Sequence, residues 1–187
     1  MKIILGSQSV GRKKILENMG YVFDVINPNI DEKTIRHDDP VQLTCALAHA
    51  KADALIPRIK ESAKLITSDQ VVWCNGKILE KPESVAEAYS FFELYANYPA
   101  ETVTSVVVVN LETGWRASGT DIAKIFLKII PKEIIKAYID TGDPFTHAGG
   151  FDIDHPMLVP YIDRIEGEYE SVIGLPKKLT QNLLRIV

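Results

Sequence analysis

The sequence has few cysteines, no long apolar run and no excess of basic residues. Its two cysteines, Cys45 and Cys74, are isolated from each other, so they form neither a disulfide framework nor a metal knuckle and indicate a reducing, cytoplasmic setting. No apolar run approaches the ~20 residues that span a bilayer, and no signal-peptide pattern begins the sequence, so we expect no membrane partner. The formal net charge of −4 at pH 7 argues against binding to a nucleic-acid polymer.

The short motifs of several enzyme classes are also missing. There is no GxxxxGK[ST] phosphate loop, no GxGxxG dinucleotide fingerprint and no GxSxG nucleophile elbow. None of the four histidines stands four residues from another, which argues against a dedicated zinc site. A phosphate-binding site in this chain therefore needs another architecture.

What is present fits one globular domain over residues 1–187, with 46% hydrophobic residues available for a core. The patterns predict strands at 3–5, 21–26, 65–68, 71–73, 101–111 and 115–129, and helices from about 12 to 19, 40–55, 85–95, 131–140 and 176–186. Strands alternate with helices, yet the two longest strands form a hairpin. We therefore predict an α/β fold with a mixed, twisted sheet and flanking helices, not a purely parallel one.

The first sixteen residues carry the strongest functional signal. A short apolar strand, Ile3 to Leu5, runs into Gly6-Ser7-Gln8-Ser9, and a helix with the basic first turn Arg12-Lys13-Lys14 follows. This order brings free backbone N–H groups, hydroxyls and a guanidinium to one place, which is how a chain builds an anion site. Basic residues in a first turn oppose the helix dipole, and a bound phosphate would account for them. A basic surface turn after an edge strand is the alternative, and this segment alone does not decide between the two.

Three charged residues further along the chain are candidate site residues. Lys51 lies on the apolar stripe of its helix, four residues after Leu47, and either extends to the rim of the core or enters a cleft; the helix pattern alone favours the rim. Asp69 stands at the end of a predicted buried strand, where α/β folds place chemistry, although an Asx turn is a common alternative. Lys81 precedes Pro82 in a segment that, by itself, favours an exposed, charged edge strand.

These features together are the groups that phosphoryl chemistry uses. The basic residues would hold phosphates, while Asp31, Glu32 and Asp69 would hold a divalent cation, because hard cations take oxygen ligands. Mg²⁺ typically bridges carboxylates to substrate phosphates. The sequence therefore points to phosphoryl or nucleotidyl chemistry.

Several short blocks stand in a fixed order along the chain. They are Ser7-Gln8-Ser9-Val10-Gly11-Arg12, Ile30-Asp31-Glu32, Leu47-Ala48-His49-Ala50-Lys51-Ala52, Ser68-Asp69-Gln70-Val71-Val72, Glu80-Lys81-Pro82, Thr141-Gly142-Asp143-Pro144, Ala148-Gly149-Gly150-Phe151, Ile165-Glu166-Gly167 and Val172-Ile173-Gly174-Leu175-Pro176. In this order they resemble the Maf family, the septum-formation-inhibitor-like nucleotide pyrophosphatases, over almost the whole chain. The resemblance implies one domain with two lobes around a cleft, as in inosine triphosphatases.

The resemblance also implies an activity: hydrolysis of a nucleoside triphosphate between its α and β phosphates, giving a monophosphate and pyrophosphate, with Mg²⁺ or Mn²⁺. The implied catalytic residues are Lys51 and Lys81 together with two acids that would also bind the metal, Asp69 and Glu32. The implied substrate-binding residues are Ser7, Ser9, Arg12 and Lys13. A homodimer is implied as a possible assembly. The family's older name leaves a non-catalytic, nucleotide-binding regulator of cell division as an alternative.

Gly11, Gln70 and Asp154 bear on the choice of nucleotide. One branch of the family prefers dTTP and UTP; the other prefers 7-methyl-GTP and has Gln after the catalytic Asp and an acid in a late block. Gln70 and Asp154 resemble the second branch, so we predict 7-methyl-GTP, with dTTP and UTP as the alternative. A carboxylate accepts the adjacent N1–H and N2–H donors of guanine, whereas thymine and uracil would place a carbonyl oxygen against it. Gly11 departs from the Arg or Trp that is common at its position.

Overall fold

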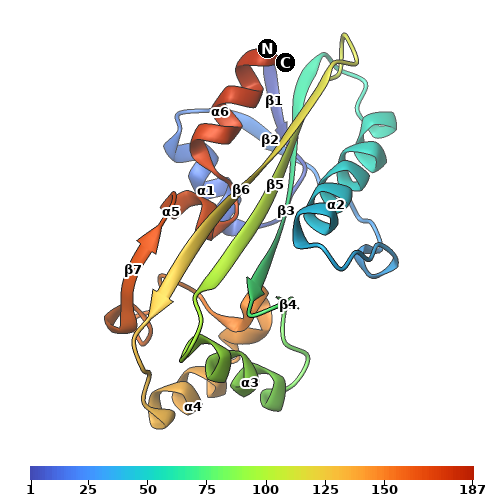
Figure 1. Cartoon of the computed structure of the whole chain (residues 1–187). Helices are drawn as coiled ribbons and strands as arrows, with labels where there is room; N and C mark the ends of the chain where they lie inside the picture. The colour runs from blue at the N-terminus through green and yellow to red at the C-terminus, as the bar shows by residue number, and fades with distance from the viewer.

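A seven-stranded mixed sheet runs along the molecule in the computed structural model, which describes residues 1–187 (Figure 1). Its strand order is β2-β1-β3-β5-β6-β7, with β4 paired to β3 outside this path. β1 pairs with β2 and with the first part of β3 in parallel, and the remaining pairs are antiparallel. The predicted α/β fold with a mixed sheet and a long hairpin is confirmed.

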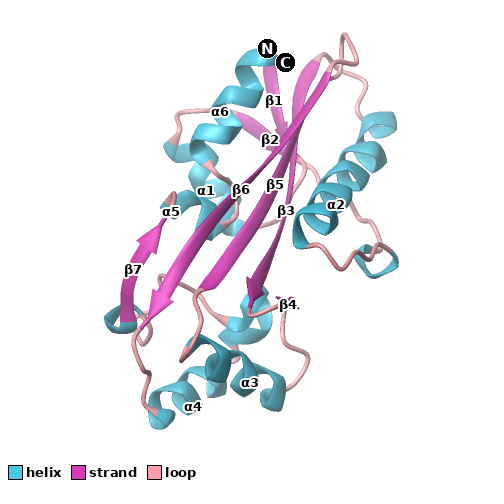
Figure 2. Ribbon diagram, in the orientation of Figure 1, coloured by secondary structure: helices cyan, strands magenta, loops and turns pink.

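The elements follow one another along the chain as Figure 2 shows. The strands are β1 (Lys2–Leu5), β2 (Phe23–Val25), β3 (Ala63–Cys74), β4 (Lys77–Leu79), β5 (Ala100–Asn110), β6 (Arg116–Leu127) and β7 (Ile162–Glu166). The helices are α1 (Val10–Asn18), α2 (Pro40–Leu55), α3 (Val85–Tyr95), α4 (Lys132–Asp140), α5 (Tyr169–Ile173) and α6 (Lys177–Ile186). No helix of the molecule combines the length and apolar character that crossing a membrane requires.

β5 explains why the sheet carries helices on both faces. Alternate residues of a strand point to opposite faces, and nearly every residue of β5 is buried. Val106 and Val108 belong to an apolar cluster with residues of α1 and α6, whereas Val107 and Val109 belong to a second cluster with residues of α2. In Figure 1, α2 accordingly lies on one side of the sheet and α1, α5 and α6 on the other.

A third apolar cluster fills the end of the molecule that lies away from the two termini. It joins α3 and α4 to the chain around Phe151, and its aromatic rings meet edge to face: Phe92 with Tyr95 and Tyr138, and Tyr95 with Phe151. Figure 1 shows α3 and α4 together at this lower end, below the strands. The sheet thus has helices packed along its upper part and a separate helical cap at its lower end.

Local hydrogen bonds and one tight turn explain where several elements begin and end. Asp39 caps α2 ahead of Pro40, and Ser84 caps α3 by accepting from the backbone N–H of Glu87. Asn75 and Gly76 take φ values of 45° and 79° in the turn from β3 to β4, as the Asn-Gly pair predicts.

Two predictions differ from the structure. The segments 65–68 and 71–73 are one continuous strand, β3, so Asp69 lies in the middle of a strand and not at its end. The strand continues because Asp69 and Gln70 keep their backbone pairing with Ser105 and Thr104 of β5, while their side chains find polar partners. β7 and α5 were not predicted, because both are short and mostly exposed or half-buried.

Candidate active site

A cleft opens where β1 ends beside its longer neighbour β3. The last residue pair between them is Leu5 with Ile66, after which the chain turns away into α1, and β4 joins β3 only from Val72 onward. The edge of β3 between these points carries Asp69 into a polar cavity of about 800 Å³, which we call the polar cleft. Its walls are the segments 6–12, 27–30 and 146–148 with Glu32, Lys51, Asp69, Gln70, Lys81 and Ile173.

Most of the residues predicted from the sequence lie around this cleft. Those that line it are Ser7, Ser9, Gly11, Arg12, Glu32, Lys51, Asp69, Gln70 and Lys81. Lys13 lines neither this cleft nor the cavity beside it, because the helical turn directs Lys14 toward that cavity instead. Asp154 lines only the neighbouring cavity.

Lys51 joins two carboxylates in the polar cleft. Its Nζ lies 2.5 Å from Oδ1 of Asp69 and 2.9 Å from Oε1 of Glu32. The side chains of Lys51 and Asp69 are each 8% exposed, whereas that of Glu32 is 52% exposed. The expectation that Lys51 extends to the rim is wrong, since Asp69 supplies a buried counter-charge. Burial raises the pKa of the Asp69 carboxyl, and the charges of Lys51 and Arg12 oppose that shift.

Arg12 closes the opposite wall of the cleft and also holds it together. Its Nη1 donates to the carbonyl oxygen of Ser68 at 2.8 Å and to Oγ of Ser7 at 3.3 Å, and its Nε donates to the carbonyl oxygen of Gly174 at 2.9 Å. Burial lowers the pKa of the guanidinium, and the charges of Asp69 and Glu32 oppose this. Arg12 therefore connects α1 to β3 and to the end of α5, with Nη2 left for a further acceptor.

The start of α1 has the form predicted for an anion site. Ser9 is the N-cap, and its Oγ accepts from the backbone N–H of Arg12 at 3.4 Å. Ser7, which is 6% exposed, accepts from the backbone N–H of Ser9 at 3.2 Å. The free N–H groups of this helix end and its dipole favour an anion in the cleft.

A second, smaller cavity of about 280 Å³ continues from the polar cleft, and we call it the side cavity. The two share residues 9–11 and 147–148, together with Gln70 and Ile173. Apolar side chains form much of the side cavity's wall, and Lys14, Asp152 and Asp154 supply its charges. Asp154 is exposed at this wall and accepts a hydrogen bond from the hydroxyl of Tyr169, while Oδ1 of Asp152 accepts from the backbone N–H of Asp154 at 2.9 Å.

Gln70 and Gly11 shape the junction of the two cavities through α5. Nε2 of Gln70 donates to the carbonyl oxygens of Ser171 at 2.7 Å and Val172 at 3.1 Å, as well as to Oγ1 of Thr104. Its amide nitrogen is therefore occupied, and only Oε1 is left for a ligand. At Gly11, a Cβ atom would lie 2.6 Å from Cγ2 of Ile173, so the missing side chain lets α1 approach α5.

A second group of possible metal ligands was not predicted from the sequence. One ligand atom from each of Asp143, His147 and Asp152 lies within 4.8 Å of the others, so this cluster could hold a metal ion. His147 lines both cavities. The spacing of Asp143 and His147, four residues apart, was the only sequence signal, since Asp152 is brought to them by the fold.

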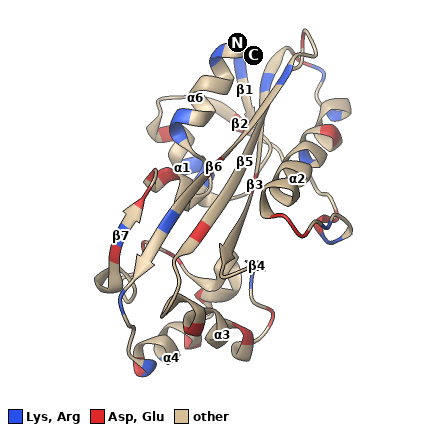
Figure 3. Cartoon of the chain, in the orientation of Figure 1, with Lys and Arg blue, Asp and Glu red and all other residues tan.

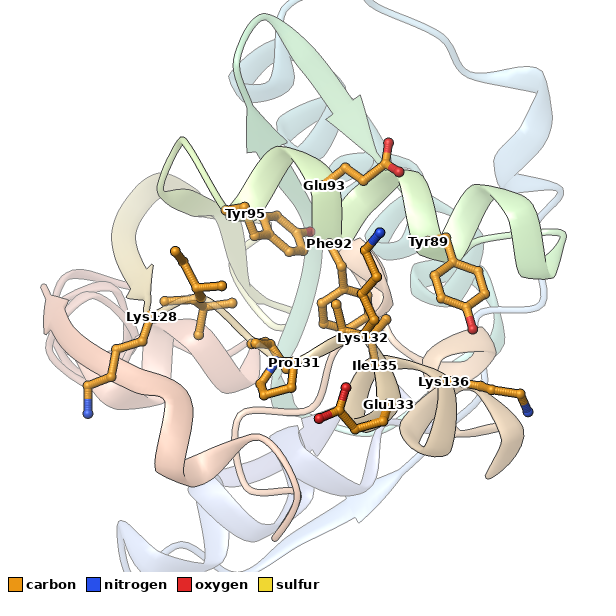
Figure 4. A pocket seen from close by; sticks show the side chains of 14 residues that line it. Tyr89, Phe92, Glu93, Tyr95, Lys128, Pro131, Lys132, Glu133, Ile135 and Lys136 are labelled. Atoms are coloured by element: carbon orange, nitrogen blue, oxygen red, sulfur yellow. The ribbon is translucent and has the colours of Figure 1, made fainter.

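An apolar cavity of about 710 Å³ lies elsewhere, between α3, α4 and the connection from β6 to α4 (Figure 4). Tyr89 and Phe92 from α3 face Pro131 and Ile135 across it, and lysines and glutamates stand at its edge. It contains none of the predicted site residues. Figure 3 shows Lys and Arg as well as Asp and Glu among the helices at both ends of the molecule.

Comparison with known proteins identifies the family to which the chain belongs. A family model described as Maf-like protein matches residues 2–187. A 7-methyl-GTP pyrophosphatase from Dictyostelium discoideum is 46% identical over 189 residues, covering 97% of this chain and 95% of its own. A dTTP/UTP pyrophosphatase from Vibrio vulnificus (strain YJ016) is 33% identical and covers 98% and 97% of the two chains.

Two further matches are more distant. A nucleoside triphosphate pyrophosphatase from a Synechococcus species is 31% identical, covering 98% of this chain and 92% of its own. Among solved structures, a nucleoside-triphosphatase/dITP/XTP pyrophosphatase from Mycobacterium abscessus is 15% identical with a TM-score of 0.40, over 70% and 75% of the two chains, which is too distant to inform the site. The family match over residues 2–187 and the 46% identity confirm the sequence resemblance, and the chain belongs to the Maf family.

Proposed function

We propose that this protein is a nucleoside triphosphate pyrophosphatase that cleaves the bond between the α and β phosphates, with 7-methyl-GTP as its substrate. The observation that carries the proposal is the group of Lys51, Asp69 and Glu32 at 2.5 and 2.9 Å inside the polar cleft. A buried lysine between two acids costs desolvation free energy, and catalysis is a function that accounts for such a site.

The polar cleft has the charges that a triphosphate needs. A nucleoside triphosphate carries about four negative charges at neutral pH, and Arg12, Lys51 and Lys81 line the cleft together with the N-terminus of α1. Preorganised cations of this kind stabilise the charge that builds up on departing pyrophosphate more strongly than water does. We expect Ser7 and Ser9 to bind phosphate oxygens through their hydroxyl or backbone N–H groups.

Asp69 and Glu32 fit a hard divalent cation such as Mg²⁺ or Mn²⁺. In each carboxylate one oxygen pairs with Lys51 and the other is left to bind an ion, and such ions prefer oxygen ligands. When bound, the ion would supply Lewis-acid stabilisation of phosphate oxygens. A competing location for the ion is the cluster of Asp143, His147 and Asp152. A variant of His147 therefore accompanies that of Asp69 in the test for the metal.

We assign Asp69 as the general base. In the proposed step, the oxygen of water bonds to the α-phosphorus as its proton passes to Asp69, and the bond from that phosphorus to the bridging oxygen of pyrophosphate breaks. Lys51 and Arg12 favour the ionised form of Asp69 that this step requires, while burial raises the pKa of its carboxyl and so favours acceptance of a proton. The proton then leaves to solvent, so the products are the monophosphate and pyrophosphate.

We expect the side cavity to bind the 7-methylguanine base. Asp152 and Asp154 line it, and two carboxylates favour a base that carries adjacent N–H donors and the positive charge of 7-methylation. Identity of 46% to a 7-methyl-GTP pyrophosphatase, against 33% to a dTTP/UTP pyrophosphatase, supports the same choice.

A panel of nucleotides tests the proposal. Purified protein with Mg²⁺ is incubated with 7-methyl-GTP, GTP, dTTP and UTP, and the monophosphate and pyrophosphate are measured. We expect kcat/KM to be highest for 7-methyl-GTP, with pyrophosphate and not orthophosphate released. A higher kcat/KM for dTTP or UTP would assign the chain to the pyrimidine branch, and nucleotide binding without turnover would favour the regulator.

We also propose that the protein is a cytoplasmic homodimer. Light scattering tests the dimer, and cell fractionation tests the location.

A further inference from the structure

Two buried tyrosine hydroxyls hold the segment 147–154, which connects the polar cleft to the side cavity. The hydroxyl of Tyr138 on α4 donates to Oδ2 of Asp143 at 2.9 Å and accepts from the backbone N–H of Asp152 at 2.8 Å. The hydroxyl of Tyr95 on α3 donates to the carbonyl oxygen of Gly149 at 2.7 Å. Tyr138 is 0% and Tyr95 3% exposed, so water does not substitute for either hydroxyl.

The segment 147–154 has no regular strand or α-helix of its own to fix it. It makes a single 3-10 turn at Ala148–Gly150, in which Gly149 and Gly150 have φ values of 72° and 68°. A Cβ atom at Gly149 would lie 2.6 Å from Val72 and 2.7 Å from the Tyr95 hydroxyl. The backbone is therefore held in a narrow space by its hydrogen bonds to the two helices and by one from the N–H of Gly149 to the carbonyl oxygen of Glu80 at 3.0 Å.

Side chains of the segment 147–154 form one wall of both cavities. His147 and Ala148 line the polar cleft and the side cavity, and residues 151–154 line the side cavity alone. Tyr138 fixes the backbone at Asp152, whose own carboxylate accepts from the N–H of Asp154. The position of Asp152 in the side cavity thus depends on one hydroxyl on α4, and Asp154 is linked to it through Asp152 while also accepting from the hydroxyl of Tyr169.

The two tyrosines are themselves fixed by the packing of α3 against α4. Phe92 contacts Tyr95 and Tyr138 edge to face, with ring centroids 6.0 and 5.9 Å apart, and the ring of His155 lies 4.7 Å from that of Tyr138. Figure 4 shows Phe92 and Tyr95 on α3 above the residues of α4. Burial raises the pKa of both tyrosines, so the two hydroxyls stay protonated and able to donate across the physiological pH range.

We propose that Tyr95 and Tyr138 are positioning residues that set the nucleoside-binding wall of the site, and that neither touches the substrate. This proposal rests on the proposed function for its kinetic readouts. Tyr138 acts on the part of the wall that lines only the side cavity, whereas Tyr95 acts at the junction with the polar cleft. Loss of either hydroxyl weakens recognition of the nucleoside and leaves the phosphate chemistry in place.

Tyr138→Phe and Tyr95→Phe test this, with Tyr89→Phe as the matched control. Tyr89 lies on α3 beside the apolar cavity and makes no hydrogen bond to segment 147–154. For Tyr138→Phe we expect KM for 7-methyl-GTP to rise about 3- to 10-fold while kcat stays within about 2-fold, as loss of one buried hydrogen-bonded link predicts. Inhibition by inorganic tripolyphosphate, which has no nucleoside, should be unchanged. Tyr95→Phe should raise KM similarly, and Tyr89→Phe should match wild type.

Amide hydrogen exchange provides a readout that does not need activity. We expect faster exchange over residues 149–154 in Tyr138→Phe and Tyr95→Phe, without faster exchange in β5. If wild type hydrolyses no nucleotide, the proposed function fails, and exchange still tests the positioning role. If Tyr138→Phe does not fold, Tyr95→Phe tests the same positioning role through the hydrogen bond of its hydroxyl to Gly149. The proposal would be overturned if the tyrosine variants kept the KM and the amide exchange of wild type. It would also be overturned if they bound 7-methyl-GTP and tripolyphosphate more weakly by the same factor.

Discussion

Asp69 and Lys51 form an ion pair whose two side chains are each only 8% exposed. Such a pair is weak evidence for stability, because the desolvation of two charges offsets much of their attraction. Neighbouring positions on β3 and α2 that face the same side are apolar, such as Leu65 and Leu47. The charges are therefore placed against the local preference for apolar packing, which is a common sign of a functional site.

Substitution of Asp69 is the most direct test at the scale of single residues. We expect Asp69→Asn to lower kcat for 7-methyl-GTP by about 100-fold or more, because asparagine keeps the shape but neither accepts the proton nor holds a cation. Pyrophosphate release under saturating substrate measures this. Circular dichroism should show an intact fold, since the apolar clusters on both sides of the sheet are unchanged.

Glu101→Gln is the control for this substitution. Glu101 lies on β5, where it pairs with Lys124 at 3.0 Å, and it lines neither cavity. Its loss should leave kcat within about 2-fold, because partly exposed ion pairs contribute little. Turnover by Asp69→Asn within a few-fold of wild type would remove Asp69 from the catalytic role.

The raised pKa of Asp69 also predicts how stability depends on pH. The folded state keeps a proton on Asp69 over a range in which the unfolded chain, with a pKa of about 3.9, has lost it. The resulting stabilisation is complete below the unfolded pKa and is lost as pH rises through the folded pKa. Relative to wild type, Asp69→Asn should therefore gain free energy of unfolding as pH rises from the unfolded pKa through the raised folded pKa. Urea unfolding at several pH values measures the difference, and a constant difference would contradict this prediction.

At the scale of elements, the sequence predicts what local periodicity and caps determine. α2 and α3 begin at the predicted residues 40 and 85, directly after their N-caps Asp39 and Ser84, because an N-cap is a local hydrogen bond that the sequence specifies. β3 was divided in the prediction at Asp69 and Gln70, since two polar residues break an apolar pattern. The structure keeps the strand because Lys51 and the α5 carbonyl oxygens satisfy those side chains, and both partners are distant in sequence. Long-range pairing of this kind cannot be obtained from a local pattern.

The contact between α1 and α5 gives a prediction at this scale. Gly11→Ala would place a Cβ 2.6 Å from Ile173 Cγ2 and 3.2 Å from its carbonyl oxygen. Alanine favours a helix over glycine by about 1 kcal/mol, yet we expect the variant to be less stable than wild type by about 1 kcal/mol because of overpacking. Urea unfolding of wild type and of Gly11→Ala measures the difference in their free energy of unfolding.

Ile173→Ala removes Cγ2 together with the rest of the side chain beyond Cβ, and it provides the partner substitution for this test. In an Ile173→Ala background, Gly11→Ala should destabilise less than in wild type, because the contact at 2.6 Å is gone while the carbonyl oxygen at 3.2 Å remains, and a double-mutant cycle isolates the side-chain contribution. Glu17→Ala on the exposed side of α1 serves as the helix control. Stabilisation by Gly11→Ala in the wild-type background would show that close approach to α5 does not require the glycine.

At the scale of the whole molecule, the two cavities join parts of the fold that are far apart in sequence. The polar cleft takes residues from α1, α2, β3, α5 and the segment 146–148, and the side cavity adds Thr102 of β5 and residues 151–154. Lys51 and Asp69, which the family resemblance implied as site residues, lie 2.5 Å apart, whereas Lys13 lies outside both cavities. The cluster of Asp143, His147 and Asp152 was not foreseen, because the turn that brings Asp152 back depends on Tyr138 of α4.

A nucleotide that fills both cavities should stabilise the entire fold, and the metal should contribute through identifiable residues. With a non-hydrolysable α,β-methylene analogue of 7-methyl-GTP at about 100 times its Kd, plus Mg²⁺, we expect about 2.7 kcal/mol of added stability, a Tm increase of roughly 5–10 °C. Tripolyphosphate should give a smaller shift, because it occupies the polar cleft alone. EDTA should abolish turnover and reduce the analogue's shift, and Mg²⁺ or Mn²⁺ should restore both.

Two variants locate the ion that this experiment detects. Asp69→Asn should lose the metal-dependent part of the Tm shift, because it removes a carboxylate that faces the phosphates, whereas His147→Ala should retain that part. The reverse pattern would assign the ion to the cluster of Asp143, His147 and Asp152, where an imidazole ligand also favours Zn²⁺ over Mg²⁺. Full activity of the wild type in EDTA would reject the metal-assisted step and leave Lys51, Arg12 and Lys81 as the groups that neutralise the triphosphate.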